Sequence, residues 1–260
     1  MLYEGFTHLL VQKENKILVI KFNNPRKKNC INFNGYKELS RALGAVNLDE
    51  TVSIVVITGA GDFFTAGNDL SQKTDVNDMD AYLKETNDTF KAMVSSFLNC
   101  NKLIFSLVNG PAIGIGSTIV GLSDVAWCAE EAYFQTPFSK LGLVPEACSS
   151  LTFPLIMGRS KATEMLVFNE EMSAQEAYKF NFVSRIFKLN ELDSVVWPKI
   201  REYAELPPNS MRECKRLIQL PLRELLIRAN DAECDALLKR FYDTECIQAI
   251  IDFAQRKSKL

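Results

Sequence analysis

The sequence predicts an α/β fold that ends in a helical C-terminal region. Two continuous runs of apolar and β-branched residues, VSIVVIT at 52–58 and LIFSLV at 103–108, are typical of strands buried on both faces of a sheet. Strand-like and helix-like segments alternate before the pattern becomes helical throughout. We therefore expect a core over residues 1–190 and a helical region over residues 191–260.

The core opens with two strand-like runs, at 7–13 and 17–22. The short polar segment Glu-Asn-Lys separates them, as in a β-hairpin. Asn24-Pro25 then interrupts the chain, because a proline restricts the residue before it. A helical pattern follows at 34–46. These features predict a hairpin followed by the first helix.

Glycine-containing turns at 59–62 and 109–111 end the two buried runs. A long amphipathic pattern between the runs predicts a helix at 77–99. After the second turn, a further pair of strand-like runs occupies 124–128 and 132–135. Strands and helices therefore continue to alternate through the core.

The C-terminal region predicts short helices at 191–204 and 209–219, divided by Pro207-Pro208. Apolar residues then recur at three- and four-residue spacing over 222–241, which places them on one face of a helix. This face fits either core packing or a contact between subunits.

Composition excludes several classes of protein. The 260 residues carry a net charge of −2, so the strong basic footprint of a dedicated nucleic-acid binder is absent. No apolar run reaches the ~18 residues of a membrane span, and the N-terminus lacks the long apolar segment of a secretory signal. His8 is the single histidine, and the seven cysteines never form C-x-x-C, which argues against a zinc site, a disulfide scaffold or a Ser-His-Asp triad. We expect no metal, no nucleic-acid partner and no membrane span.

Two loops that follow the buried runs are candidates for ligand binding, because ligands collect beyond the carboxyl ends of strands in open α/β sheets. In the loop FFTAGNDL, residues 63–70, small residues would let a ligand approach the backbone N–H of Asn68. In the loop NGPAIGIG, residues 109–116, the turn would expose a helix N-terminus and a second donor near Ile115. Taken alone, each loop also fits an ordinary glycine turn.

The segment LGLVPEACSS, residues 141–150, contains the candidate base Glu146. Apolar residues and glycine precede this glutamate and a helix-like segment follows it. Poor solvation would raise the pKa of the carboxyl and suit it to proton transfer near neutral pH. The alternative is a solvated glutamate in the first turn of a helix, where it would stabilise the helix dipole.

The three segments together resemble the crotonase (enoyl-CoA hydratase/isomerase) superfamily over nearly the whole chain. The motifs are F-T-A-G-N-D-L at 64–70, N-G-P-A-x-G at 109–114 and T-P-F-S-x-L-G-x-x-P-E-x-C-S-S at 136–150. Within the superfamily they are most similar to peroxisomal Δ3,Δ2-enoyl-CoA isomerases. The resemblance implies a crotonase-like ββα spiral core that holds an acyl-CoA site. It also implies C-terminal helices that build homotrimers, which in some relatives pair as hexamers.

The resemblance also implies the site. The backbone N–H groups of Asn68 and Ile115 would form an oxyanion hole for a thioester carbonyl, and Glu146 would be the catalytic acid and base. Coenzyme A would be part of the substrate, and no separate cofactor is expected. The expected substrate-binding residues are Phe64, Ala66, Gly67, Asn68, Asp69, Leu70, Gly114, Phe138 and Leu143.

The positions that hold two glutamates in the hydratases of the superfamily are Thr118 and Phe138 here, and neither can act as a base. One base without a second acid favours a Δ3,Δ2-enoyl-CoA isomerase of fatty acid β-oxidation. The alternatives are a hydratase, thioesterase or other acyl-CoA enzyme of the same fold, and a non-catalytic acyl-CoA-binding relative. A serine hydrolase at Ser149 or Ser150 is poorly supported, because G-x-S-x-G is absent.

The last three residues, Ser258, Lys259 and Leu260, spell the S-K-L address for peroxisomes. They predict recognition by the peroxisomal import receptor and a location in the peroxisomal matrix. The acyl-binding extension that precedes the core in some relatives is expected to be absent, because the core begins near Phe6.

Overall fold

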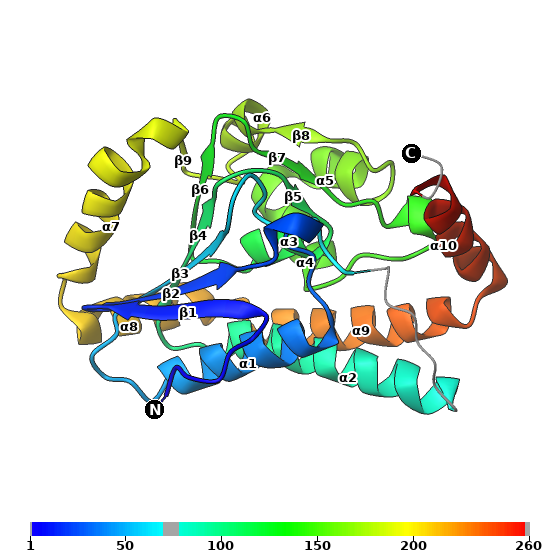
Figure 1. The fold of residues 1–260 in the computed structure, drawn as a ribbon, viewed down its shortest axis with the longest axis horizontal. Helices are drawn as coiled ribbons and strands as arrows, with labels where there is room; N and C mark the ends of the chain where they lie inside the picture. The colour runs from blue at the N-terminus through cyan, green and yellow to red at the C-terminus, as the bar shows by residue number, and fades with distance from the viewer. Residues whose placement is uncertain (1, 70–77, 258–260) are drawn as a thin grey trace.

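The computed structural model describes residues 2–69 and 78–257, which form an α/β fold with two sheets (Figure 1). Within these ranges the larger sheet has six strands, in the order β1-β2-β3-β4-β6-β9. The first pair is antiparallel and the others are parallel. The strands are β1 (Leu9–Glu14), β2 (Ile17–Phe22), β3 (Ile54–Gly59), β4 (Leu103–Val108), β6 (Val125–Ala129) and β9 (Arg185–Phe187).

The predicted hairpin is confirmed as β1 and β2, which pair from Leu9 opposite Phe22 to Glu14 opposite Ile17. Asn15 takes the positive φ of 51° that a tight hairpin turn requires. β1 begins two residues later than predicted, and the N–H groups of Thr7, His8 and Leu9 donate to the Glu38 carboxylate of α1 (Phe33–Val46).

The two buried strands of the prediction are also confirmed. All six residues of β3 are buried, and β4 lies parallel beside it. The other predicted strand pair is divided between the two sheets. The turn at 130–132 sends the chain from β6 into β7 (Tyr133–Gln135), which pairs with β5 (Ala112–Ile113) and β8 (Met172–Ser173). The second sheet therefore includes part of a candidate loop.

Helices cover both faces of the larger sheet. In chain order they are α1 (Phe33–Val46), α2 (Met79–Leu98), α3 (Ile115–Val120), α4 (Ser149–Met157), α5 (Arg159–Leu166), α6 (Ala174–Lys179), α7 (Trp197–Ala204), α8 (Pro208–Gln219), α9 (Arg223–Phe241) and α10 (Thr244–Lys257). Short 3₁₀ turns lie at η1 (Pro25–Lys27), η2 (Ser139–Leu141) and η3 (Leu189–Glu191), and a π-helical turn, η4 (Leu192–Val196), leads into α7.

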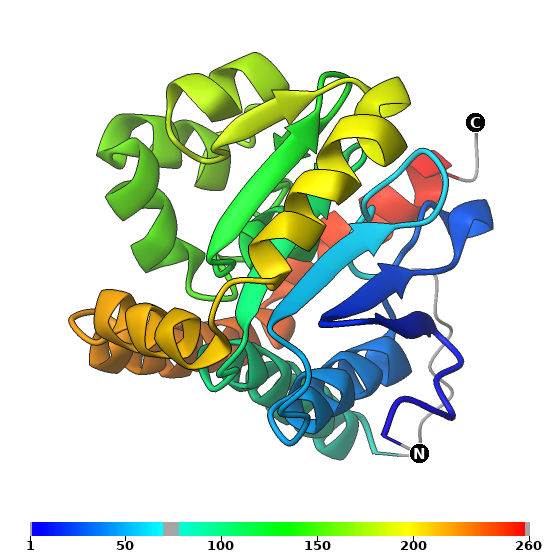
Figure 2. The same cartoon turned by 90° about the vertical axis from the view of Figure 1, so that its left-hand side faces the viewer.

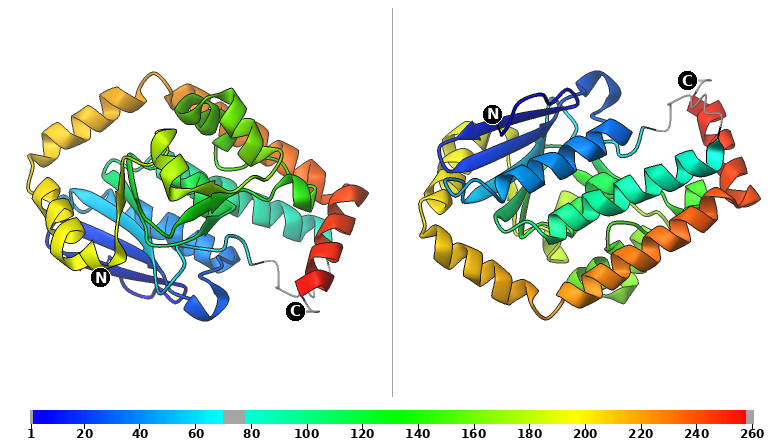
Figure 3. Two further views of the ribbon diagram at one scale, coloured as in Figure 1. Left: turned by 90° about the horizontal axis from the view of Figure 1, so that it is seen from above. Right: turned by 90° about the horizontal axis from the view of Figure 1, so that it is seen from below.

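The C-terminal helices pack directly on the core. Figure 2 shows α7 in front of the larger sheet, where Tyr203 packs edge-on against Trp127 of β6. Figure 3, seen from below, shows α9 beside α2 and α2 beside α1. The side-chain amide of Asn230 on α9 donates to the Lys91 carbonyl of α2 at 3.2 Å. The C-terminal region is therefore continuous with the layer of helices beneath the sheet.

Candidate active site

Two loops meet at the carboxyl ends of the neighbouring parallel strands β3 and β4. The Thr65 N–H donates to the Pro111 carbonyl at 3.2 Å, and the Ile113 N–H donates to the Thr65 carbonyl at 2.9 Å. The loops therefore pair like short parallel strands, with Thr65 opposite Ala112. This is the edge of the sheet where the sequence predicts a ligand site.

Glycines allow the two loop backbones to come this close. A Cβ atom on Gly67 would lie 2.7 Å from the Ile113 carbonyl oxygen, and Gly67 has a positive φ of 85°. A Cβ atom on Gly110 would lie 1.9 Å from the Asp62 carbonyl oxygen. No side chain fits at either distance, so both contacts depend on glycine.

Buried polar side chains hold the first loop in place. The Thr65 hydroxyl donates to the Asn29 carbonyl at 2.7 Å and accepts from the Gly67 N–H at 3.0 Å. The side chain of Asn109, which begins the second loop, accepts from the Gly59 N–H at 2.9 Å and donates to the Gly61 carbonyl at 2.7 Å. These bonds satisfy backbone groups of the loop and of the turn that precedes it.

The backbone N–H of Asn68 is available as a donor. Asn68 forms a parallel bridge with Ile31: the Ile31 N–H donates to the Gly67 carbonyl at 2.8 Å, and the Asp69 N–H donates to the Ile31 carbonyl at 2.9 Å. In such a bridge the N–H of the central residue points away from its partner strand. In the described part of the chain, no backbone or side-chain acceptor takes up this N–H.

The N–H of Ile115 is the second available donor. Ile115 is the first residue of α3, and the first N–H groups of a helix have no partner within it. The preceding Gly114 offers no side-chain cap, and no acceptor among residues 2–69 and 78–257 takes up this amide. The Cβ position of Gly67 lies 3.8 Å from the Gly114 Cα, so the two available amides lie on adjoining segments.

Glu146 lies in the turn between η2 and α4 and is partly buried. Burial raises the pKa of its carboxyl to about 8, and the negative charge of Glu233 on α9 adds to the rise. Among the described residues, no hydrogen bond reaches this carboxyl. The prediction that its surroundings disfavour the charged form is confirmed in direction and cause.

Tyr36 of α1 connects Glu146 with the first loop. Its hydroxyl donates to the side-chain oxygen of Asn68 at 3.5 Å. Burial raises the pKa of the Tyr36 hydroxyl, and the charge of Glu146 contributes to that rise, so the two side chains are neighbours. Sequence reasoning missed Tyr36, because a tyrosine on the inner face of a helix carries no local signal of a site.

The other predicted substrate-binding residues occupy different environments. Phe64 is fully buried and packs edge-on against Phe22 at 5.5 Å, and Phe138 is buried as well. Asp69 is paired with Lys27 at 3.0 Å. Ala66, Gly114 and Leu143 are partly buried around the loops, and Leu70 lies outside the described residues. Contact of these residues with a ligand stays a prediction.

Thr118 and Phe138, which fill the positions of the hydratase glutamates, are both buried. The Thr118 hydroxyl donates to the Ile115 carbonyl at 3.3 Å, within its own helix. Neither side chain offers a carboxylate near Glu146. The nearby acid that sequence reasoning missed is Glu233, 87 positions further along the chain, and only its place on α9 relates it to the site.

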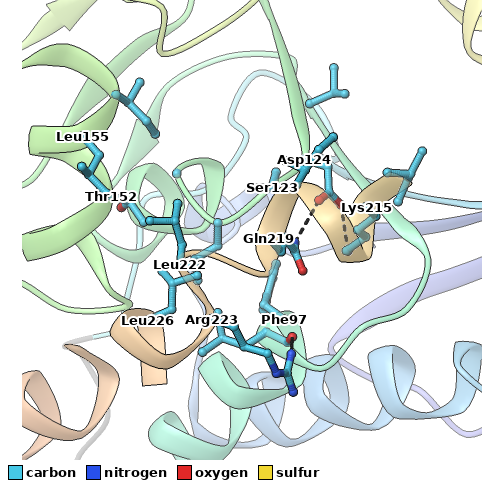
Figure 4. Close-up of a pocket in the computed structure, with 17 residues that line it drawn as sticks. Phe97, Ser123, Asp124, Thr152, Leu155, Lys215, Gln219, Leu222, Arg223 and Leu226 are labelled. Atoms are coloured by element: carbon cyan, nitrogen blue, oxygen red, sulfur yellow. Dashed lines mark hydrogen bonds and ion pairs between the residues drawn. The ribbon is translucent and has the colours of Figure 1, made fainter. Parts of the chain in front are cut away.

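A pocket of about 460 Å³ lies elsewhere, near the amino ends of β4 and β6 and between α4, α8 and α9 (Figure 4). Three of its polar side chains already interact with one another: Lys215 pairs with Asp124 at 2.8 Å, and Gln219 donates to Asp124 at 3.0 Å. The rest of its lining is mainly apolar. This pocket is therefore separate from the loops that carry Asn68 and Ile115.

The described residues contain neither a metal-binding cluster nor a membrane-spanning helix. No group of three or more His, Cys, Asp or Glu side chains is placed to hold a metal ion in residues 2–69 and 78–257. Over the same ranges, every helix is too short or too polar to cross a membrane.

The sequence matches the Enoyl-CoA hydratase/isomerase family over residues 12–259. It is 42% identical to "Enoyl-CoA delta isomerase 2" of Rattus norvegicus, over 97% of this chain but only 64% of that protein. It is 38% identical to "Enoyl-CoA delta isomerase 3, peroxisomal" of Mus musculus, over 96% of this chain and 79% of the relative. The crystal structure of an enoyl-CoA hydratase/isomerase from Pseudoalteromonas atlantica T6c has a TM-score of 0.86 and 29% identity, over 96% of this chain and 98% of that one. The predicted crotonase-like fold is confirmed.

The close contact at Gly110 predicts the effect of a small substitution. Gly110→Ala is expected to lower the free energy of unfolding by about 1–3 kcal/mol, because its methyl group would collide with the Asp62 carbonyl. Urea unfolding measures the change. Gly44→Ala on α1 is the matched control, because nothing lies within 4 Å of its Cβ position. Equal stability of the two variants would contradict the contact.

Proposed function

Because the chain belongs to the enoyl-CoA hydratase/isomerase family, we propose that it is a Δ3,Δ2-enoyl-CoA isomerase of fatty acid β-oxidation. The observation that carries the proposal is the partly buried Glu146 carboxyl, whose pKa is raised to about 8, beside Tyr36, whose hydroxyl donates to the Asn68 side chain. Relatives named as enoyl-CoA delta isomerases, 38% and 42% identical, support an isomerase.

The oxyanion hole of this proposal consists of the N–H groups of Asn68 and Ile115. Both would donate to the thioester carbonyl oxygen of the substrate. As the oxygen becomes negative, preorganised amides stabilise it without having to reorient. The loss of one such donor typically raises the barrier by about 2.7–4 kcal/mol. The glycine contacts described above keep the two loops in place for this role.

The proton shuttle needs one carboxyl group. The Glu146 carboxylate takes a C2 proton of the 3-enoyl thioester, and the electrons of that C–H bond form a dienolate with its negative charge on the thioester oxygen. The protonated carboxyl then returns a proton to C4. The double bond moves from C3–C4 to C2–C3, and the carbonyl is restored. Proton and charge balance without a redox or metal cofactor, and coenzyme A leaves as part of the product.

The residues at the positions of the two hydratase glutamates distinguish this reaction from hydration. A hydratase holds and activates a water molecule between two carboxylates, whereas Thr118 and Phe138 occupy the matching positions here. A hydroxyl that already donates to the Ile115 carbonyl and a buried aromatic ring cannot replace those bases. Water addition to a 2-enoyl-CoA is therefore expected to be slow relative to isomerisation.

Glu146→Gln is expected to lower kcat for 3-hexenoyl-CoA by about 10²- to 10⁴-fold, because the amide cannot accept the C2 proton. Absorbance of the conjugated 2-enoyl thioester follows the reaction. Acyl-CoA affinity, measured by calorimetry, should be nearly unchanged. Glu131→Gln, at an exposed glutamate in the turn before β7, is the matched control. Turnover near that of the unmodified protein in Glu146→Gln would refute the role of Glu146.

We also propose a homotrimer, or a hexamer of two trimers, built through the C-terminal helices. Large apolar side chains stand exposed around the pocket of Figure 4, including Leu155 of α4, Ile218 of α8 and Leu222 just before α9. Exposed apolar patches of this kind are typical of contacts between proteins. The resemblance to crotonases favours further copies of this chain as the partner.

Ile218→Asp should weaken this association, because a charge would be buried in an apolar contact. Ile218 is 75% exposed in the single chain, so folding of the protomer should be unaffected. Sedimentation velocity is expected to show a smaller species for this variant. Val195→Asp, at an exposed apolar residue of η4, is the control. An unchanged assembly, or a protein that is already monomeric before mutation, would count against the proposal.

The proposed location is the peroxisomal matrix. The S-K-L ending supports it, and one relative carries the word peroxisomal in its name. Residues 258–260 lie outside the described structure.

Deletion of Leu260 should abolish peroxisomal import of the chain fused at its N-terminus to a fluorescent protein. The import receptor recognises the complete tripeptide. Microscopy beside a peroxisomal marker measures the outcome. Leu2→Ala, at an exposed residue of the other end, is the control. Unchanged import after the deletion would mean that another address exists.

A further inference from the structure

Glu233 caps the turn that carries Glu146. One of its carboxylate oxygens accepts from the Cys148 N–H at 2.6 Å, and the other accepts from the Ser150 N–H at 2.8 Å. Glu233 is only 6% exposed, although it comes from the distant helix α9. Its carboxylate therefore supplies the partners that the first N–H groups at the start of α4 lack within the helix.

This cap holds an unfavourable backbone conformation. Ala147 and Cys148 follow Glu146 directly and have φ values of 53° and 61°, in the left-handed region. This conformation is unfavourable for a residue that is not glycine, because its Cβ comes too close to the following carbonyl oxygen. The thiol of Cys148 adds a second tie to α9, because it donates to the Leu226 carbonyl at 3.3 Å. Contacts with helix α9 therefore fix the position of the backbone that directly follows Glu146.

The two carboxyl groups differ in their hydrogen bonds. Burial raises the pKa of Glu233, but two backbone N–H groups and the Ser150 side chain oppose that rise. The Glu146 carboxyl has no such donors in the described part of the chain, and the Glu233 charge adds to the rise of its pKa. Two coupled carboxyls in unequal environments ionise in separate steps, and the anion that accepts more hydrogen bonds forms first. Glu233 should therefore ionise at lower pH than Glu146.

Other titratable groups near the pair do not cancel this effect. Tyr36 of α1 faces Glu146, and Cys148 and Cys234 lie near Glu233; burial raises the pKa of all three, so they stay neutral. Lys91 of α2 reaches α9 but pairs with the half-exposed Asp231 at 2.8 Å. Over residues 2–69 and 78–257, no salt bridge engages Glu233.

We propose that Glu233 is a positioning residue for the proposed isomerisation: its carboxylate holds the turn that carries Glu146 and keeps a fixed negative charge behind that base. Only the effect of Glu233 on catalysis rests on the proposed function. The charge destabilises the Glu146 carboxylate, which makes it a stronger base and lets it return the proton near neutral pH. Its structural part, the coupling of two carboxyls, can be measured without turnover.

Glu233→Gln tests the proposal, because it keeps the size of the side chain and removes its charge. In the unmodified protein, kcat/KM should rise with pH as Glu146 ionises, with its midpoint near pH 8. In Glu233→Gln the midpoint should fall by about one pH unit or more, since a like charge has been removed. The plateau of kcat should also fall, because one oxygen acceptor of the cap is lost. Glu233→Asp, which keeps the charge, should lower the plateau but leave the midpoint in place.

A purely structural cap would lower the plateau or the melting temperature without moving the midpoint, and that result would overturn the proposal. Asp235→Asn is the control, because it removes an exposed charge from the same helix and should not move the midpoint.

Infrared difference spectroscopy of the carboxyl C=O band provides a readout that needs no turnover. Above the pH range in which ordinary exposed carboxyls ionise, two steps are expected in the unmodified protein, because the pKa values of Glu146 and Glu233 are both raised. The upper step should disappear in Glu146→Gln while the lower one remains. Loss of the lower step instead would reverse the order of ionisation and overturn the proposal, even if Glu233→Gln does not fold. If the two steps follow this pattern but no isomerase activity is found, the proposed function fails and the coupling stands.

Discussion

The partial burial of one unpaired carboxyl group is the constraint on which the candidate site depends. Water stabilises the charged form of a carboxylate strongly, and a site that withholds water and hydrogen bonds shifts the group toward its protonated form. Glu146 is in this situation, and its pKa rises to about 8. A carboxyl with a pKa near the pH of the surroundings both accepts and returns a proton readily. The surrounding segments hold the Glu146 carboxyl in this poorly hydrated position.

Five segments far apart in the chain contribute to that arrangement. Two loops after β3 and β4 bring the available amides of Asn68 and Ile115 onto adjoining segments, and glycines make their contact possible. Helix α1 adds Tyr36, and α9 adds the cap on the turn after Glu146. The Arg240 guanidinium, also on α9, donates to the Gly142 carbonyl at 2.7 Å on the other side of that turn. The C-terminal helices therefore belong to the architecture of the site as well as to the surface that is available for assembly.

Much of the fold could be predicted from local pattern. β3 and β4 are continuous apolar runs, and α1 and α2 have helical periodicity over three or more turns, so each carries its own signal. The elements that escaped prediction are mostly short or lack a clear period, such as β5, with two residues, and α6, with six. Such segments take their structure from the neighbours against which they pack. The division of β6 and β7 between two sheets could not be predicted either, because strand pairing depends on which strands come together in the tertiary structure.

The sequence by itself determined the alternation of strands and helices, the two glycine loops and the identity of Glu146 as the candidate base. These depend on periodicity, on turn-forming residues and on motifs that are contiguous in the chain. Only the tertiary structure decided that Tyr36 and Glu233 stand beside that base, that Phe64 is buried in the core and that the amides of Asn68 and Ile115 have no partner among the described residues. The physical reason is that solvation and electrostatic coupling depend on distance in space, and separation along the chain does not specify that distance.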